Sequence, residues 1–217
     1  MLFLFSWNGI GMEMVIEIAQ GIFQEAKDQG LIAWIATVAG IVYLILAARN
    51  NILCWPWGIV SCSLWAYTTY WDYDLYLDAI LQLFYVFMAF VGIYQWKFGG
   101  GEQERLAVST MPFRKHLPLL FLGSLCSVLF GYFFATYTPA AATYLDAFTT
   151  VFSVIATFLL VRRILDNWIY WIVVDAIYIY LYGSRGAYLF ALLMVWYVYV
   201  ATKAYFIWKK EWQTKNG

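Results

Sequence analysis

Hydrophobic residues gather in seven long stretches, separated by short polar segments, that fill almost all of the chain after Gly30. Each stretch approaches the roughly 20 residues that an α-helix needs to cross a bilayer. The backbone must satisfy its own hydrogen bonds inside hydrocarbon, which favours helices, and the alternation typical of a membrane β-barrel is missing. The pattern predicts an all-α integral membrane protein with seven spans, at about 31–48, 52–70, 75–96, 117–135, 145–161, 167–183 and 187–208.

The first 30 residues follow a different pattern. Acidic and amide side chains recur there at helical spacing, and apolar side chains occupy another face. We therefore expect residues 1–30 to form an amphipathic helix in the membrane interface rather than a cleavable signal peptide, which would need a basic start and a small-residue cleavage site. The polar face is Glu13, Glu17, Gln20, Gln24 and Asp28, and the apolar face is Met14, Ile18, Ile22 and Ala26.

The last three spans are similar to the first three, which indicates duplication of a three-helix unit. The aligned positions are Arg49 with Arg163, Trp57 with Trp171, residues 76–85 with 188–197, and Trp96 with Trp208. A unit of three helices ends on the opposite side of the membrane from its start, so one further helix gives the second unit the same direction. The sequence predicts parallel repeats at 31–96 and 136–208, joined by a loop and linker helix at 97–135 and followed by a tail at 209–217. This is a 3+1+3 arrangement of the SWEET type.

Basic residues gather at one end of the predicted bundle. Lys27 and Arg185 fall at the other end, with Asp28, Asp72 and Asp74. The positive-inside rule then predicts a cytoplasmic C-terminus and an external N-terminus. The basic set is Arg49, Lys97, Arg105, Arg114, Lys115, Arg162, Arg163, Lys209, Lys210 and Lys215.

Composition narrows the class of protein. The 217 residues are 64% hydrophobic and only 12% charged, whereas soluble domains carry about 25% charged residues. A formal net charge of zero excludes the basic field of a nucleic-acid binder. The cysteines lie in apolar stretches as packing residues, and His116, in a polar loop, has no metal-ligand partner at suitable spacing. We expect no cofactor, no ATP coupling and no membrane-enzyme chemistry, since neither a phosphate-binding loop nor a nucleophile–base pair is recognisable.

Polar side chains within the spans are the candidates for a transport site, because such groups are costly in lipid and usually face a cavity or a partner. Asp175 lies near the middle of its span and Gln82 lies on another one, each followed by aromatic residues at helical steps. The candidate substrate-binding residues are Gln82, Asp175, Trp171, Tyr85, Trp57, Tyr178, Trp196, Asp78, Asp146 and Thr150.

Several of these positions have a structural alternative. Ser and Thr often hydrogen-bond between helices as packing contacts, and carboxylates near span ends, such as Asp78 and Asp146, can simply be hydrated. Trp and Tyr often form belts at the membrane surface. The tryptophans interpreted as belt residues are Trp34, Trp96, Trp208 and Trp212.

The residue types restrict the ligand. No Lys or Arg lies in the middle of a span except Lys203, about a turn and a half from one end, so the guanidinium or ammonium that a phosphate prefers is missing. Aromatic rings bind planar or cationic groups, and hydroxyls and carboxylates bind sugar hydroxyls. An unphosphorylated nucleoside fits this chemistry.

The ordered set of motifs in these spans resembles the PnuC family of bacterial nicotinamide riboside transporters. The segments that carry the resemblance are Asn50–Ile59, Leu75–Tyr85, Trp168–Asp175, Leu181-Tyr182 and Arg185-Gly186, within a match from about residue 31 to 208. The resemblance implies a SWEET-like 3+1+3 fold, a bacterial inner membrane location and a homotrimer with one pathway in each protomer. It also implies facilitated diffusion of nicotinamide riboside, trapped inside the cell by a kinase.

The resemblance also suggests roles for individual residues. We expect Gln82 and Asp175 to hydrogen-bond the amide or ribose, an aromatic residue such as Trp171 to stack on the pyridinium, and Asp78 and Asp146 to attract the cation. The two units would rock about a site near the middle of the membrane. A transporter of thiamine, riboflavin or a sugar, and a channel or structural membrane protein, remain alternatives.

Overall fold

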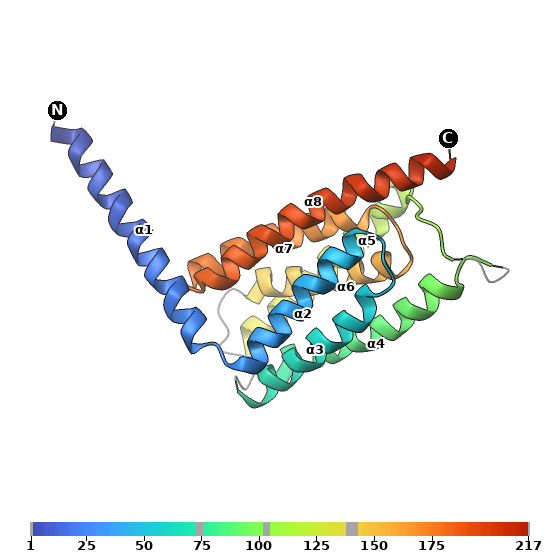
Figure 1. Cartoon of the computed structure of the whole chain (residues 1–217), viewed down its shortest axis with the longest axis horizontal. Helices are drawn as coiled ribbons and strands as arrows, with labels where there is room; N and C mark the ends of the chain where they lie inside the picture. The colour runs from blue at the N-terminus through green and yellow to red at the C-terminus, as the bar shows by residue number, and fades with distance from the viewer. Residues whose placement is uncertain (1, 73–75, 102–104, 138–142, 217) are drawn as a thin grey trace.

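The computed structural model describes residues 2–72, 76–101, 105–137 and 143–216, and Figure 1 shows their helices in chain order. Across these ranges the chain forms eight α-helices. They are α1 (Leu2–Asp28), α2 (Leu31–Ala48), α3 (Cys54–Trp71), α4 (Tyr76–Phe98), α5 (Phe113–Tyr137), α6 (Thr143–Val161), α7 (Asn167–Ser184) and α8 (Tyr188–Asn216).

The structure confirms an all-helical membrane protein. Five of the described helices, α2, α4, α5, α6 and α8, are long and apolar enough to cross a membrane. The other two expected spans coincide with α3 and α7, which are rich in Trp, Tyr and hydroxyl side chains. Each of these two helices packs between two others. The neighbouring helices shield its polar side chains from lipid, which lowers the free-energy cost of placing them in the membrane.

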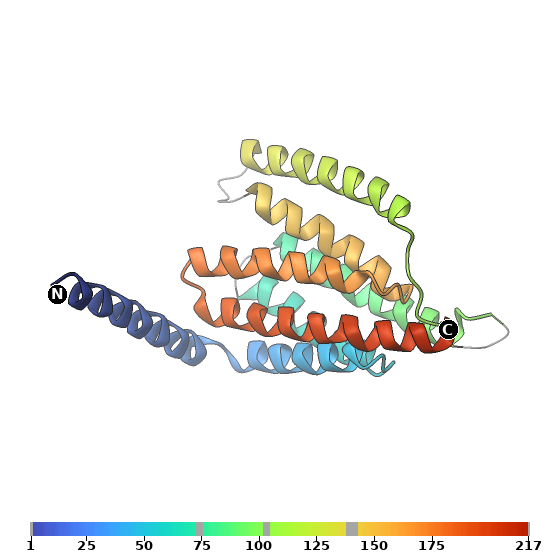
Figure 2. The ribbon, with the colours of Figure 1, turned by 90° about the horizontal axis from the view of Figure 1, so that it is seen from above.

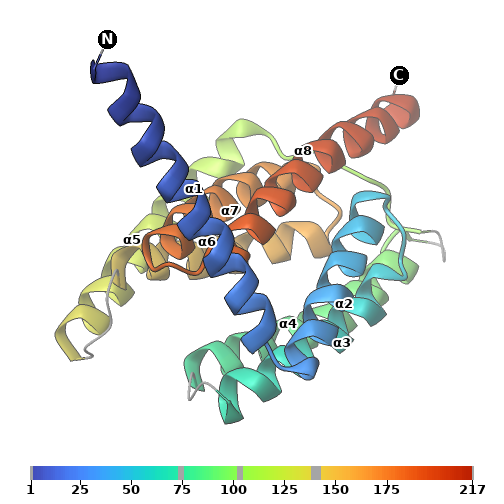
Figure 3. The same cartoon turned by 60° about the vertical axis from the view of Figure 1, so that its left-hand side comes forward.

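Six helices form a closed ring (Figures 1 and 3). Helix α3 packs between α2 and α4, and α7 packs between α6 and α8. The two triplets then meet twice, through α2 with α8 and through α4 with α6. Helix α5 lies outside the ring against α6 (Figure 2). The N-terminal end of α1 projects away from the bundle, and its C-terminal part contacts α8. The matching order of contacts is what two related three-helix units would give.

Two turns at one end of the ring have the same backbone geometry. Asn50 has φ 56° and Arg163 has φ 52°. The Asn50 N–H donates to Ala47 O, and the Arg163 N–H donates to Leu160 O, both at 2.9 Å. The turns therefore pair Asn50 with Arg163, and the sequence alignment of Arg49 with Arg163 was wrong by one residue. The corrected register places Trp55 opposite Trp168 rather than Trp57 opposite Trp171.

A tryptophan cluster joins the two triplets at this end. The indole of Trp96, on α4, donates to Leu160 O on α6 at 3.2 Å, and that of Trp208, on α8, donates to Ala47 O on α2 at 3.1 Å. Trp96 is 1% exposed and Trp208 is 0% exposed. Their interpretation as membrane-belt residues was therefore wrong, because both side chains complete a core shared by the two triplets.

The opposite end of the ring is held by the last turns of α1. Both oxygens of the Glu25 carboxylate accept backbone N–H groups at the start of α8, from Tyr188 at 2.8 Å and Leu189 at 3.0 Å. Trp34 of α2 donates its indole N–H to Ala26 O at 3.1 Å. The α1 segment thus contacts the first helix of one triplet and the last helix of the other. It is helical as expected, and its polar face is largely exposed.

Candidate functional site

Asp175 lies on α7 inside the helix ring and is only 5% exposed. Tyr85 of α4, Tyr178 of α7 and Tyr197 of α8 are near enough to interact with it electrostatically. Within the described parts of the chain, we find no group that hydrogen-bonds the Asp175 carboxylate. A buried carboxylate without such a donor is costly, so the position is suited to a bound ligand that supplies the missing donors or charge.

Hydroxyl groups of α6 face these tyrosines. Ser153 lies beside Tyr85, and Thr149 lies beside Tyr178. Ser153 donates its hydroxyl hydrogen to Thr149 O at 2.7 Å, and Thr149 donates to Leu145 O at 3.0 Å. Because each hydrogen goes to the residue's own helix, the oxygen lone pairs remain available to the tyrosine hydroxyls or to a ligand.

The remaining two helices of the ring contribute Tyr43 and Cys62. Tyr43 of α2 interacts electrostatically with Cys62 of α3, and with Tyr85 and Tyr197. Every helix of the ring therefore places a polar or polarisable side chain toward the same interior region. We call this set the central cluster: Tyr43, Cys62, Tyr85, Ser153, Asp175, Tyr178 and Tyr197.

Three of the ten residues singled out from the sequence, Asp175, Tyr85 and Tyr178, meet in the central cluster. Gln82 is half-buried one helical turn before Tyr85, and Trp171 is half-buried one turn before Asp175. Trp171 also packs against both hydrophobic cores. These two lie on the same helix faces as cluster members, which is compatible with contact to one ligand.

Three other candidates lie elsewhere. Trp57 is 43% exposed and Trp196 is 42% exposed. Trp57 lines an exterior groove beside Trp34, and Trp196 packs on Tyr199. Thr150 is half-buried, but its neighbour Thr149 is the threonine that faces Tyr178. The structure therefore does not bring Trp57 and Trp196 to the interior position that stacking on a central ligand requires.

Asp78 and Asp146 lie at the end of the ring opposite the tryptophan cluster, which we call the acidic end. Asp78 is in the first turn of α4, and Asp146 is in the first turn of α6. The Asp146 carboxylate is paired with Arg185, with Oδ2 and Nη2 2.8 Å apart. Tyr182 lies near both carboxylates, and its ring stacks on that of Tyr178 with centroids 5.5 Å apart. Aromatic rings thus connect the acidic end to the central cluster.

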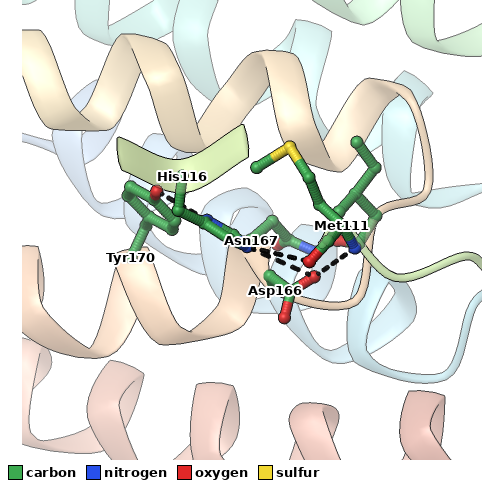
Figure 4. Close-up of polar contacts among 6 residues, drawn as sticks. Met111, His116, Asp166, Asn167 and Tyr170 are labelled. Atoms are coloured by element: carbon green, nitrogen blue, oxygen red, sulfur yellow. Dashed lines mark hydrogen bonds and ion pairs between the residues drawn. The ribbon is translucent and has the colours of Figure 1, made fainter. Parts of the chain in front are cut away.

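A second polar network lies at the end of the ring that holds the tryptophan cluster, which we call the basic end. It surrounds the point where the chain enters α5 (Figure 4). His116 Nδ1 lies 2.9 Å from the Tyr170 hydroxyl, and the Met111 N–H donates to Asp166 Oδ2 at 2.8 Å. His116 belongs to α5 rather than to a loop. The preceding segment, expected to be a loop, hydrogen-bonds the α6–α7 turn: Ser109 N–H donates to Arg163 O, and Leu165 N–H donates to Ser109 O. This network fixes the linker onto the second triplet.

Arg163 completes the basic end. It is buried, donates to Leu106 O and to Asn50 O, and holds its guanidinium 4.5 Å from the Trp96 ring centroid. Burial lowers the pKa of this guanidinium below its usual value. Arg163 therefore acts as a structural cation between the two matched turns and lies at the end of the ring, away from Asp175.

The chemistry of the central cluster is that of a carboxylate among phenols and hydroxyls. Lys203 of α8 is exposed and faces Tyr199 on the exterior. No group of three or more metal-ligating residues occurs in the described part of the chain. An exterior groove of about 570 Å³ between α6 and α7 is lined by Leu145, Ile172 and other apolar side chains, which suits lipid rather than a polar solute. The interior cluster is thus the better candidate for a polar or cationic ligand.

The sequence analysis missed Tyr43, Cys62, Ser153 and Tyr197 as members of the central cluster, and Thr149 as the neighbour of Tyr178. The internal repeat contains the signal for two of them. Tyr197 is the aligned counterpart of Tyr85, and the corrected turn register makes Cys62 the counterpart of Asp175. Applying the repeat to the candidate residues, rather than only to the fold, would have identified both.

Comparison with known proteins places the chain among transporters. A family model described as nicotinamide mononucleotide transporter matches residues 30–210. The nicotinamide riboside transporter PnuC of Neisseria mucosa is 28% identical over 209 residues, covering 92% of this chain and 78% of that protein. The protein of the same name from Escherichia coli is 22% identical over 209 residues, covering 83% of this chain and 86% of that one. A crystal structure of the vitamin B3 transporter PnuC has a TM-score of 0.69 and 24% identity, covering 92% of this chain and 90% of the other. This last likeness shows a shared fold.

Proposed function

The chain belongs to the nicotinamide mononucleotide transporter family, and from this premise we propose that it carries nicotinamide riboside across the membrane. The single observation that supports this substrate most is Asp175, buried among tyrosines without a described hydrogen-bond donor. A pyridinium cation complements both parts of such a site, because a carboxylate attracts its charge and aromatic faces bind its ring.

The unphosphorylated riboside suits the site better than the mononucleotide. A phosphate would need cationic or N–H donors, and among the described residues Arg163 and Lys203 lie at the basic end and on the exterior. A phosphate beside Asp175 would instead face a like charge. Relatives named nicotinamide riboside transporters agree with this choice.

We assign roles by position in the ring. Asp175 and Gln82 hydrogen-bond the ribose or carboxamide, Tyr85 and Tyr178 supply further hydroxyls, and Trp171 stacks on the pyridinium. Asp78 and Asp146 attract the cation at the acidic end. The ligand-binding set differs from the sequence-based expectation by leaving out Trp57 and Trp196, which are exposed on the exterior.

The proposed mechanism is alternating access. The two triplets, α2–α4 and α6–α8, would form parallel repeats in a 3+1+3 arrangement of seven spans with α5 as the linker, and they would rock about the central cluster. Excess positive charge at the basic end supports a cytoplasmic C-terminus. The protein would act by facilitated diffusion as a homotrimer in a bacterial inner membrane, and a cytoplasmic kinase would trap the riboside by phosphorylation.

Calorimetry with the detergent-purified protein tests the substrate. Nicotinamide riboside should bind saturably, and nicotinamide mononucleotide should not. Asp175→Asn should weaken riboside binding about 10- to 100-fold, as expected for the loss of a charged hydrogen-bonding partner. Trp196→Phe, on the exterior, is the matched control and should change affinity less than about twofold.

The outcomes separate the parts of the proposal. Binding of thiamine or riboflavin instead of the riboside would replace the substrate and keep the transport mechanism. Riboside affinity that is unchanged in Asp175→Asn would exclude the central cluster as the binding site. Binding of the mononucleotide at least as tightly as the riboside would refute the argument from charge.

A further inference from the structure

Arg185 forms an exposed ion pair at the acidic end of the ring. Its Nη2 atom is 2.8 Å from Asp146 Oδ2, and the two side chains are 42% and 39% exposed. Asp146 lies in the first turn of α6, and Arg185 directly follows α7, so the pair connects two helices of the second triplet. Asp78, in the first triplet, is close enough to interact electrostatically with Asp146. Arg185 is therefore paired with one of two neighbouring carboxylates that belong to different triplets.

This ion pair is the first member of a continuous row of side chains that reaches Asp175. Tyr182 interacts electrostatically with Asp78, Asp146 and Arg185. Its ring lies nearly parallel to that of Tyr178, with an interplanar angle of 14°. Tyr178 in turn is near Asp175, whose buried carboxylate has no hydrogen-bond donor among the described residues. The row begins with an arginine that is paired and ends with a carboxylate that has no cationic partner in the described parts of the chain.

We propose that Arg185 is a resident cation that a cationic substrate displaces from Asp146 on its way to Asp175, so that Arg185 sets how strongly the entrance prefers cations. The inference rests on the proposed transport of nicotinamide riboside. An exposed ion pair is weak, so the pyridinium can replace the guanidinium in each passage without a large barrier. The guanidinium also prevents two uncompensated carboxylates from attracting inorganic cations into the pathway.

The size of the effect follows from Coulomb's law. Removing the arginine charge leaves the substrate cation attracted by both carboxylates without a competing positive charge. For unit charges about 7 Å apart and an effective dielectric constant between about 40 and 80, the attraction changes binding about three- to sevenfold. The KM of the cationic riboside should fall by this factor in Arg185→Gln. The uncharged dihydro form of the same riboside has nearly the same size, and its KM should change less than about twofold.

The test is the ratio of the KM values for the two forms, measured from saturable initial uptake by intact bacteria that lack their own riboside transporter. Arg185→Gln should raise the ratio of neutral to cationic KM about three- to sevenfold, and Arg185→Lys should restore it by keeping the charge. Lys215→Gln is the matched control, since Lys215 also pairs with a carboxylate, Glu211, but at the basic end.

Each result decides between the proposals. An unchanged ratio in Arg185→Gln, or an equal shift in Lys215→Gln, overturns the role of Arg185 and leaves the proposed substrate intact. Absence of saturable riboside uptake by the unmodified protein overturns the proposed substrate and the role of Arg185 together. If Arg185→Gln does not accumulate in the membrane, Asp146→Asn replaces it. That variant should raise the KM of the cationic form alone, and an equal rise for the neutral form would refute the inference.

Discussion

Gly92 on α4 is a position where a single methyl group should destabilise the fold, because Trp55 of α3 packs directly against its Cα. A Cβ atom at residue 92 would lie 2.4 Å from Cε2 and Cζ2 of the Trp55 indole. Trp55 is only 2% exposed and is enclosed by the rings of Tyr43 and Trp96, with centroids 6.3 and 5.2 Å away. The indole therefore has little room to move, and Gly92→Ala must displace α4 from α3.

The two opposing effects of this substitution can be compared. Alanine is favoured over glycine in a helix by about 1 kcal/mol. Overpacking a well-filled core costs about 1–3 kcal/mol, and a contact this short with a rigid ring belongs at the upper end of that range. The net loss should be about 2 kcal/mol. For a chain of this size, this corresponds to a fall of about 4–8 °C in the unfolding midpoint.

The assay is thermal unfolding of the purified protein in one detergent at a fixed scan rate, with Gly183→Ala as the control. An added Cβ at Gly183 would meet nothing within 4 Å, so that variant should be neutral or slightly stabilised. Replacing the fused indole of Trp55 with the smaller phenyl ring of Phe relieves this contact, and the double variant should recover at least about 1 kcal/mol relative to additivity. A Gly92→Ala protein as stable as Gly183→Ala would refute the packing argument.

Three further predictions concern the paired tryptophans, the cap on α8 and the role of Asp175. Trp208→Phe should lower the free energy of unfolding by about 1 kcal/mol, because it loses the hydrogen bond to Ala47 O of α2. Trp96→Phe should lower it by a similar amount, because it loses the equivalent bond to α6. A loss seen in only one of the two variants, measured by thermal unfolding, would contradict the matched roles of the indoles. Glu25→Ala should lower stability by about 1 kcal/mol through loss of the cap on α8, whereas Glu13→Ala on the exposed part of α1 should have no measurable effect. If Asp175 carries a proton during transport, Asp175→Asn should abolish accumulation driven by a pH gradient. Substrate exchange in proteoliposomes should persist at riboside concentrations that saturate the weakened site, and unchanged pH-driven accumulation would exclude this coupling.

The helices were predictable because each one follows from a local and strong signal. A run of apolar residues near span length defines a membrane helix almost independently of its neighbours, and most of the observed helices begin and end within a few residues of the predicted spans. The exception is α8, which continues to Asn216 rather than ending at 208, so the expected tail at 209–217 is helical through Asn216. Among the helix starts, the main difference is at α5, which begins at Phe113 rather than at 117. Its first turn is polar, and it is fixed by contacts of His116 with Tyr170 that hydropathy does not encode.

The site was less predictable. The helical period shows which residues share one face of a helix, but it does not show whether that face points into the ring or toward the exterior. Trp57 and Tyr85 both occur in aromatic stripes, yet one lies on the exterior and the other in the ring. Trp96 is a tryptophan at the end of a predicted span, as in a membrane-surface belt, but its side chain is buried in the core. These differences depend on which helices pack together, and that pairing is set by contacts between residues far apart in the chain.

The reciprocal bonds of Trp96 and Trp208 also bear on the origin of the chain. Each triplet fills the other's core and satisfies one of its carbonyl groups, so a three-helix ancestor would have needed a second copy of itself to bury the same surfaces. A symmetric pair must place identical side chains at equivalent positions, and a carboxylate at the Asp175 position would have appeared twice in one apolar interior. Joining the copies in a single chain would remove that constraint. In this chain the counterpart of Asp175 is Cys62, and Asp175 is the one buried acidic side chain among the described residues, with no second acid to repel it there.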